Sequence, residues 1–187
     1  MGAALAAPPA PCSPGRGDLT SSTGGHVEQQ DRHVARAVDL ALENVEAGGK
    51  PFACVVVERG SGEVLVEAAN QVAQTGDLTA HAEITAIRRL AERGRSGLEG
   101  CDVYVTAYPC PMCLGALYYA QPERVVYVAT REQEDRHYED GNRYTSLATF
   151  YDEYAKPVGE RNLPAEQGGH PDPEAPFRAW SAAHPEG

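Results

Sequence analysis

The sequence predicts an α/β fold in which a mixed sheet lies between helix layers on both sides. Residues 53–57 form an uninterrupted apolar run, typical of a strand buried on both faces. Strand-like and helix-like segments then alternate over residues 101–128, as expected for parallel strands joined by helices. The 187 residues can bury a full hydrophobic core, and we detect no internal repeats.

The first predicted helix spans residues 31–49. Residues 1–30 before it are rich in Ala, Pro, Gly and Ser without an apolar period, and we expect a disordered leader there. The helix ends at the Gly48 and Gly49 pair. Its apolar positions repeat with helical spacing: Val34, Ala37, Val38, Leu40, Ala41 and Val45.

A hairpin follows this helix. The apolar run at 53–57 and a second strand at 64–70 are separated by the turn sequence Gly60, Ser61 and Gly62. A helix then begins close to His81, with Thr79 as its predicted N-cap. We predict an inward stripe of Ile84, Ile87, Leu90 and Ala91. The basic run, predicted to be a solvated helix face, comprises Arg88, Arg89, Arg93 and Arg95.

The second half continues the alternation. We predict a strand at 103–105, a helix starting at Cys110, and a further strand at 124–128. The pattern weakens beyond Thr130, where residues 131–140 are heavily charged. Residues 147–154 are helix-like, and a short segment near the C-terminus contains Phe177 and Trp180.

The chemistry-bearing residues cluster at the starts of two predicted helices. His81, Cys110 and Cys113 have the residue types and spacing of a zinc site with three protein ligands, one zinc per chain. Three ligands leave the fourth tetrahedral position open for water, as in catalytic zinc sites. Glu83 is not required as a ligand, so we expect it to transfer protons. The alternative, a redox pair of Cys110 and Cys113, leaves His81 and Glu83 without a role.

Composition narrows the classes of partner. The net charge is -11 and the pI about 4.9, so the surface as a whole repels phosphate backbones, and we do not expect nucleic acid as a partner. No run of apolar residues is long enough for a membrane span. Five cysteines, an odd number with metal-type spacing, fit a reducing compartment. With no secretory signal pattern, we expect a cytoplasmic protein.

These motifs identify a family resemblance. His81, Ala82 and Glu83, followed by residues 109–113, match the H-x-E and P-C-x-x-C pattern of zinc-dependent deaminases. Residues 31–128 resemble the cytidine/deoxycytidylate-type zinc deaminase superfamily. Asn70 and residues 79–83, 87–88, 109–116 and 176–180 are most similar to bacterial guanine deaminases.

The resemblance implies an architecture. It implies a cytidine deaminase-like three-layer α/β/α sandwich with a central mixed sheet of five strands, formed by a deaminase domain at residues 31–160. It also implies a homodimer in which the C-terminal segment, residues 161–187, is swapped between chains.

The resemblance also implies substrate contacts. Asn70 is expected to hydrogen-bond the base, with a strand-end turn residue as the alternative. Phe52 is expected to line the base pocket or to be a core residue, and Ala82 to contact the substrate. An acidic residue, Glu139 or Asp140, is expected to contact a purine, although this charged stretch also fits a solvated loop.

The reaction implied is hydrolytic removal of an exocyclic amino group from a nucleobase or nucleoside, most simply guanine to xanthine with release of ammonia. The alternatives are a cytosine or cytidine-type substrate, a tRNA adenosine substrate, and a non-catalytic zinc-stabilised binding module. Tyr108 is a departure from the family pattern, because relatives usually carry glutamate before Pro109.

Overall fold

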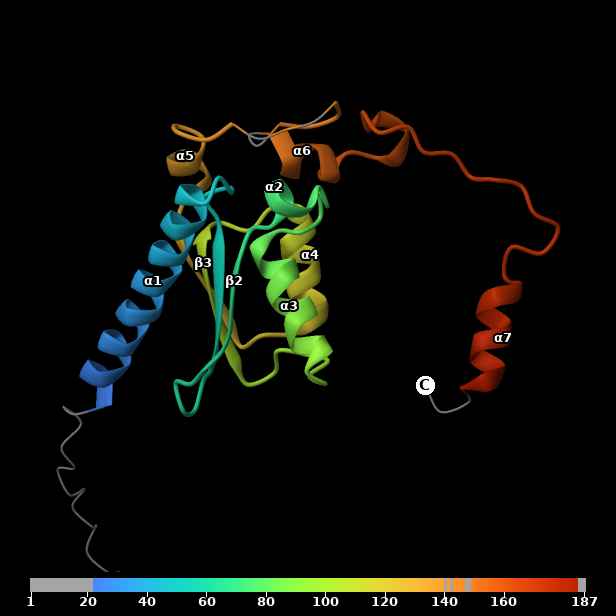
Figure 1. The fold of residues 1–187 in the computed structure, drawn as a ribbon. Coiled ribbons are helices and arrows are strands. Elements are labelled where there is room, and N and C mark those ends of the chain that lie inside the picture. Colours follow the sequence, from blue (N-terminus) through green and yellow to red (C-terminus); the bar gives the residue numbers. More distant parts are fainter. Residues whose placement is uncertain (1–21, 140, 142, 147–148, 185–187) are drawn as a thin grey trace, which may run out of the picture. The chain divides into compact units, whose positions relative to one another are not determined.

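The computed structural model describes residues 22–139, 141, 143–146 and 149–184 (Figure 1). The chain divides into two compact units, unit 1 at residues 1–128 and unit 2 at residues 129–187. In the part of the chain that is described, no helix has the length and apolar character needed to cross a bilayer.

Unit 1 is an α/β sandwich built around one sheet. Its sheet has the strand order β2-β1-β3-β4, and β1 is antiparallel to both β2 and β3. The helix α4 connects β3 to β4, the kind of connection that parallel strands require. The elements are α1 (Ser22–Glu46), β1 (Ala53–Glu58), β2 (Val64–Ala69), α2 (Val72–Thr75), α3 (Ala82–Glu92), β3 (Cys101–Ala107), α4 (Pro111–Ala120) and β4 (Arg124–Ala129, which ends at the first residue of unit 2).

The alternation of side chains along β1 builds two cores. Cys54 and Val56 pack with residues of α3 and α4 on one face of the sheet. Val55 and Val57 point to the other face, where they pack with Ala37 of α1. Figure 1 shows α1 on one side of the sheet and α3 and α4 on the other. The predicted three-layer arrangement and the predicted hairpin are therefore confirmed.

The expectation of five strands is wrong: across the described residues the sheet has four. The reason lies directly after β4. Thr130 begins a helix, α5 (Arg131–Glu134), with a reciprocal cap. The Thr130 hydroxyl accepts a hydrogen bond from the Gln133 amide (3.3 Å), and the Gln133 side chain accepts one from the Thr130 amide (2.8 Å). The charged sequence that follows offers no apolar face for another strand.

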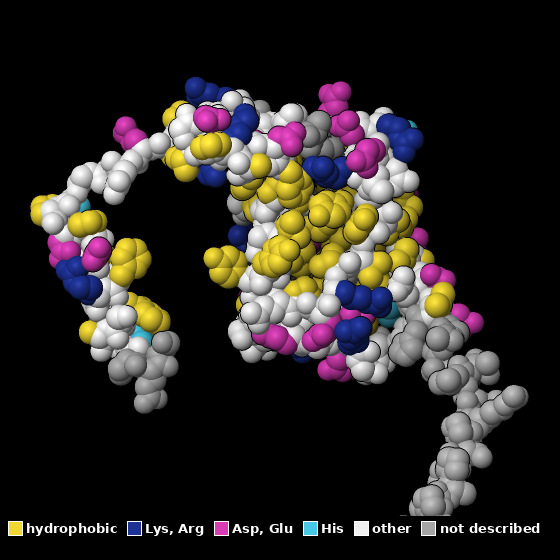
Figure 2. Space-filling view, turned by 180° about the vertical axis from the view of Figure 1, so that it is seen from behind, with side chains coloured by type: hydrophobic (Ala, Val, Ile, Leu, Met, Phe, Trp, Pro, Cys, Tyr) yellow, Lys and Arg dark blue, Asp and Glu magenta, His cyan; other side chains and the backbone are white. Residues whose placement is uncertain are grey.

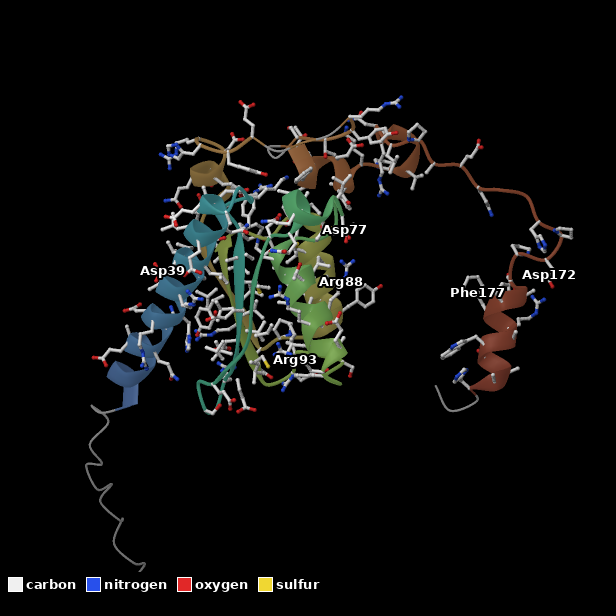
Figure 3. All side chains as sticks on the ribbon, in the orientation of Figure 1. Asp39, Asp77, Arg88, Arg93, Asp172 and Phe177 are labelled. Carbon is white, nitrogen blue, oxygen red and sulfur yellow. The ribbon has the colours of Figure 1, made fainter. Side chains whose placement is uncertain are left out.

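The helix α3 differs from its predicted form at its start and on its inward face. His81 is the N-cap, whereas Thr79, the predicted cap, lies two residues earlier and hydrogen-bonds Asp77 Oδ1 through its amide (2.8 Å) and hydroxyl (2.7 Å). Asp77 also forms an ion pair with Arg88 of α3 (3.0 Å; Figure 3). The buried residues of α3 are Ala82, Glu83, Ala86 and Leu90. Of the predicted stripe, Leu90 is therefore confirmed and Ile87 packs partly buried against the core, whereas Ala91 is exposed.

The basic run of α3 is only partly a solvated face. Arg88 is exposed, as predicted. Arg93 is also exposed and donates a hydrogen bond to the main-chain carbonyl of Leu65 in β2 (3.0 Å). Arg89 is half-buried and donates to the main-chain carbonyl of Glu67 in β2 (2.8 Å). Because β2 is an edge strand, these guanidinium groups satisfy carbonyls that no neighbouring strand reaches.

In unit 1, the helix α4 and the strand β4 carry exposed apolar side chains. Figure 2 shows hydrophobic side chains gathered on this body of the protein. Tyr118 and Tyr119 of α4 are 77% and 92% exposed, and Tyr127 and Val128 of β4 are also exposed. These exposed side chains therefore belong to β4, which is the other edge strand of the sheet, and to α4, the helix that precedes it in the chain.

Unit 2 consists of short helices. After α5 come α6 (Phe150–Ala155), a 3-10 helix η2 (Val158–Glu160) and α7 (Ala175–Ala183). Arg131 of α5 stacks over the ring of Tyr151 in α6 at 4.7 Å. Glu153 is buried and forms an ion pair with Lys156 (2.6 Å).

Candidate metal centre

The three predicted ligands come together. His81, Cys110 and Cys113 place one ligand atom each within 4.8 Å of one another. His81 Nδ1 lies 3.6 Å from Cys110 Sγ and 3.5 Å from Cys113 Sγ. One nitrogen and two sulfurs at this spacing form a compact, soft donor set that suits zinc.

The local backbone explains why these side chains converge. His81 and Cys110 are the N-caps of α3 and α4, both with extended backbone at φ -65° and -67°. Neither side chain caps its own helix, and the two side chains instead approach each other. Pro111 starts α4 with a φ already suited to a helix, and Cys113 follows within the first turn. Each helix therefore presents its positive end to the ligand atoms.

The two cysteines are electrostatically prepared for a cation. A hydrogen bond from Cys113 lowers the pKa of Cys110, which favours the thiolate form of Cys110. The same hydrogen bond, followed by burial, raises the pKa of Cys113. The pair thus shares one proton between two sulfurs, and a divalent cation can replace that proton. The donor chemistry fits zinc.

Glu83 lies beside the ligands and outside the ligand set. It is 8% exposed at the second position of α3, and its carboxyl interacts with Cys113. Burial raises the pKa of Glu83 above its ordinary value. A buried carboxyl with a raised pKa next to a metal site is the arrangement expected of a proton-transferring group.

Asn70 presents an unpaired donor. Its side chain is 1% exposed, and its Oδ1 accepts a hydrogen bond from the Val72 amide (3.0 Å). Its Nδ2 is buried and has no hydrogen-bond partner among the described residues. The Gln71 amide donates to the carbonyl of Ala80 (2.8 Å), the residue before His81, so Asn70 is held next to the metal-binding segment. A fixed and unsatisfied buried donor is a feature of ligand sites.

The other predicted contacts are distributed across both units. Phe52 is partly buried against the core that contains Ala82, which is fully buried at the first position of α3. The Phe52 carbonyl accepts a hydrogen bond from the Asn70 amide (2.9 Å), so these two residues are adjacent. Glu139 is exposed in unit 2, and Asp140 lies outside the described residues.

Asn44 was not singled out by the sequence analysis, and it is buried close to Asn70. Its Nδ2 donates to the carbonyls of Lys50 (2.7 Å) and Asn70 (3.0 Å). The signal was a polar residue continuing the helical spacing of Ala37 and Ala41, the two most buried alanines of α1. A polar side chain on an inward helix face requires partners, and here the partners are the segments that carry Phe52 and Asn70.

Comparison with known proteins gives a consistent result. Residues 27–129 match a family model described as the cytidine and deoxycytidylate deaminase zinc-binding region. The chain is similar to guanine deaminase from Bacillus subtilis, with 40% identity over 149 residues, which are 79% of this chain and 90% of that protein. A solved structure of guanine deaminase from Bacillus subtilis superposes with a TM-score of 0.73 at 38% identity, covering 81% of this chain and 93% of that chain.

Two further relatives extend the range of substrates named. A tRNA-specific adenosine deaminase from Agrobacterium fabrum is 35% identical over 119 residues, covering 61% of this chain and 76% of that protein. A mutant protein solved in complex with 8-azaguanine is 30% identical with a TM-score of 0.54, covering 59% of this chain and 65% of that chain.

Proposed function

Because the chain belongs to the family of zinc-dependent cytidine and deoxycytidylate deaminases, we propose that it deaminates guanine to xanthine and releases ammonia. The observation that carries the proposal is the donor set of His81, Cys110 and Cys113 with Glu83 buried beside it. The similarity to guanine deaminase over 90% of that protein's length supports the choice of substrate.

Different residues of the site hold the metal and transfer protons. His81, Cys110 and Cys113 would hold zinc, which when bound would supply a hydroxide-like nucleophile at neutral pH, because zinc lowers the pKa of water from 15.7 to about 7. Glu83 takes one proton from the attacking water and delivers it to a ring nitrogen. It then takes the second proton from the hydroxyl on the tetrahedral carbon and delivers it to the amine, which leaves as ammonia while the C=O bond forms. Its raised pKa suits this role, because a group that both accepts and gives a proton works best near neutral pH.

Other groups bind and orient the base. Asn70 Nδ2 donates a hydrogen bond to an acceptor on the ring, which satisfies the buried amide. Phe52 supplies an aromatic face for the ring. The amide of Ala82, in the first turn of α3, has no acceptor within its own helix and faces the developing negative charge. We assign the contact with the purine N–H groups to Glu139 or Asp140.

The direct test is ammonia release from purified, zinc-loaded protein. Guanine is compared with cytosine, cytidine, adenine and an anticodon stem-loop RNA, and zinc content is measured on the same sample. We expect guanine to be turned over and the RNA to be left intact, because a chain of net charge -11 repels a phosphate backbone. Inosine formation in the RNA without xanthine formation from guanine would select the tRNA alternative. Tight 8-azaguanine binding with no ammonia released from any substrate would select the binding module.

We also propose a homodimer, formed through α4 and β4 and closed by exchange of residues 161–187. The exposed side chains of Tyr118 and Tyr119 support an apolar interface in unit 1. The helix α7, which carries Phe177 (Figure 3), is an amphipathic segment suited to packing on a second chain. Sedimentation velocity should give a dimer for the wild type and a monomer for Tyr119→Asp, while a monomeric wild type would refute this assembly.

A further inference from the structure

We propose that Asn44 is a positioning residue, which sets the separation of Phe52 and Asn70 and thereby aims the Asn70 amide at the base. This inference rests on the proposed deaminase function. Asn44 lies in the last turn of α1, and it is 7% exposed. Its side chain forms hydrogen bonds with Lys50, Asn70 and Gln74.

The geometry is that of a clamp with three points of attachment. Asn44 Nδ2 donates one hydrogen bond to the Lys50 carbonyl (2.7 Å), just before β1, and another to the Asn70 carbonyl (3.0 Å), just after β2. Phe52 follows Lys50 by two residues, so one amide group links the backbones that carry both proposed substrate contacts. Both protons of the amide are thereby used.

Gln74 fixes the orientation of this amide. Its Nε2 donates to Asn44 Oδ1 (3.0 Å), so the Asn44 carboxamide cannot rotate by half a turn without losing all three hydrogen bonds. Gln74 belongs to α2, whose first amide, Val72, holds the Asn70 side chain through Oδ1 (3.0 Å). The short helix α2 therefore forms hydrogen bonds with the side chains of both Asn70 and Asn44.

Gly49 makes the close approach possible. A Cβ at this position would lie 2.5 Å from both Asn44 Nδ2 and Gln74 Nε2. The Gly49 amide also donates to the Asn44 carbonyl (2.7 Å), which brings the chain back along α1 toward Lys50. The absence of a side chain here is thus required by the clamp itself.

This arrangement predicts a specific kinetic signature. If Asn44 only stabilised the fold, its removal would lower the melting temperature and leave the affinity of the folded enzyme for its substrate unchanged. If it positions Asn70, its removal weakens ground-state binding of the base in folded, zinc-loaded protein. We expect Asn44→Ala to raise KM for guanine about tenfold. Because Glu83 and the ligands are untouched, kcat should change less than about threefold and keep its pH profile.

A second variant and a control make the test decisive. Gln74→Ala removes an exposed side chain, so it acts on the site only through Asn44, and we expect KM to rise about threefold without a change in melting temperature. His33→Ala is the matched control. His33 is a buried polar residue on the same helix that packs on Tyr104, with ring centroids 5.2 Å apart. We expect His33→Ala to lower the melting temperature with KM unchanged.

The outcomes separate this inference from the proposed function. Wild-type turnover of guanine with an unchanged KM in Asn44→Ala overturns the inference alone. If Asn44→Ala does not fold, an unchanged KM in Gln74→Ala has the same consequence. Wild-type protein that neither turns over guanine nor binds 8-azaguanine overturns both. Where 8-azaguanine binds without turnover of guanine, a tenfold weaker Kd in Asn44→Ala upholds the positioning role, and an equal Kd refutes it.

Discussion

Glu83 and His81 lie two residues apart, yet their side chains meet at one site because His81 is the N-cap of α3 and Glu83 lies in its first turn. Beyond the first turn, residues two apart on a helix point to different faces. At a helix start the N-cap has extended backbone, as His81 does here, and its side chain can reach across the helix end. The spacing H-x-E therefore has a geometric meaning only at a helix N-terminus.

The role of Glu83 leads to the first prediction. Glu83→Gln keeps the size of the side chain but cannot accept a proton, so turnover should fall by about 10³-fold or more. Zinc content should stay at one per chain, because Glu83 is outside the ligand set. Glu92→Gln, an exposed change on the same helix, is the matched control and should retain full activity. Wild-type-like ammonia release from Glu83→Gln would remove the basis of the assignment.

Asn70 allows a prediction about substrate binding. Asn70→Asp keeps the acceptor for the Val72 amide but replaces the unpaired Nδ2 with an oxygen. The base acceptor then faces another acceptor, so we expect kcat/KM to fall roughly 100-fold, with zinc content unchanged. Gln121→Glu introduces the same charge at the end of α4, away from these contacts. Equal kinetic effects of the two variants would argue against a direct contact.

The sequence predicted which three side chains the structure brings together as a possible metal site, because residue type and spacing indicate this chemistry. Soft ligands three residues apart at a helix start have few other uses. Asn44 was missed because its role depends on carbonyls of two segments that are distant in sequence. Such contacts follow from the packing of α1 against the strand ends, and no local pattern encodes them.

At the scale of elements, the strands were predicted closely and the helix boundaries less well. Apolar runs bounded by turns marked all four strands, because burial on one or both faces is visible in the sequence. The helix α1 begins at Ser22 rather than at the predicted residue 31, so residues 22–30 are helical although the sequence placed them in a disordered leader. Residues 1–21 of that leader lie outside the described residues. The helix α2 went unrecognised, because a single turn of four residues has no periodicity.

The ion pair between α1 and β2 gives a prediction about pH. Arg36 binds Glu67 through two hydrogen bonds (2.9 and 2.7 Å), and these lower the pKa of Glu67. A lowered pKa stabilises the folded state above the ordinary pKa of glutamate, about 4.3, and this contribution is lost as the pH falls through the lower folded-state value. Since both side chains are about one-third exposed, we expect about 0.5–1 kcal/mol.

Urea unfolding of Glu67→Gln measures this contribution. The variant should be less stable than the wild type at pH 7, and the difference should shrink toward zero below about pH 4. Glu43→Gln, which removes the more exposed partner of Arg36, is the control and should cost less. A difference independent of pH would show that packing, rather than charge, holds these elements together.

For the whole molecule, the metal acts as a cross-link between two helices. Its ligands come from the starts of α3 and α4, and Cys110 is 29 residues from His81 in the sequence. Removing zinc with a chelator should therefore abolish activity and lower the melting temperature by about 10 °C, if zinc had been present at about a thousand times its Kd. Zinc should restore both, and magnesium neither, because thiolates prefer softer ions. An unchanged melting temperature in zinc-free protein would contradict this view.

The turn of the hairpin formed by β1 and β2 lies far from the candidate site along these strands. Phe52 precedes β1 and Asn70 follows β2, so the turn around Gly60 lies at the opposite end of both strands. A Cβ at Gly60 would meet open space, so Gly60→Cys would provide a thiol for attaching a fluorophore or a solid support. A label or support attached at this turn therefore leaves the candidate site unchanged. The turn is a suitable attachment point for converting the protein into a sensor.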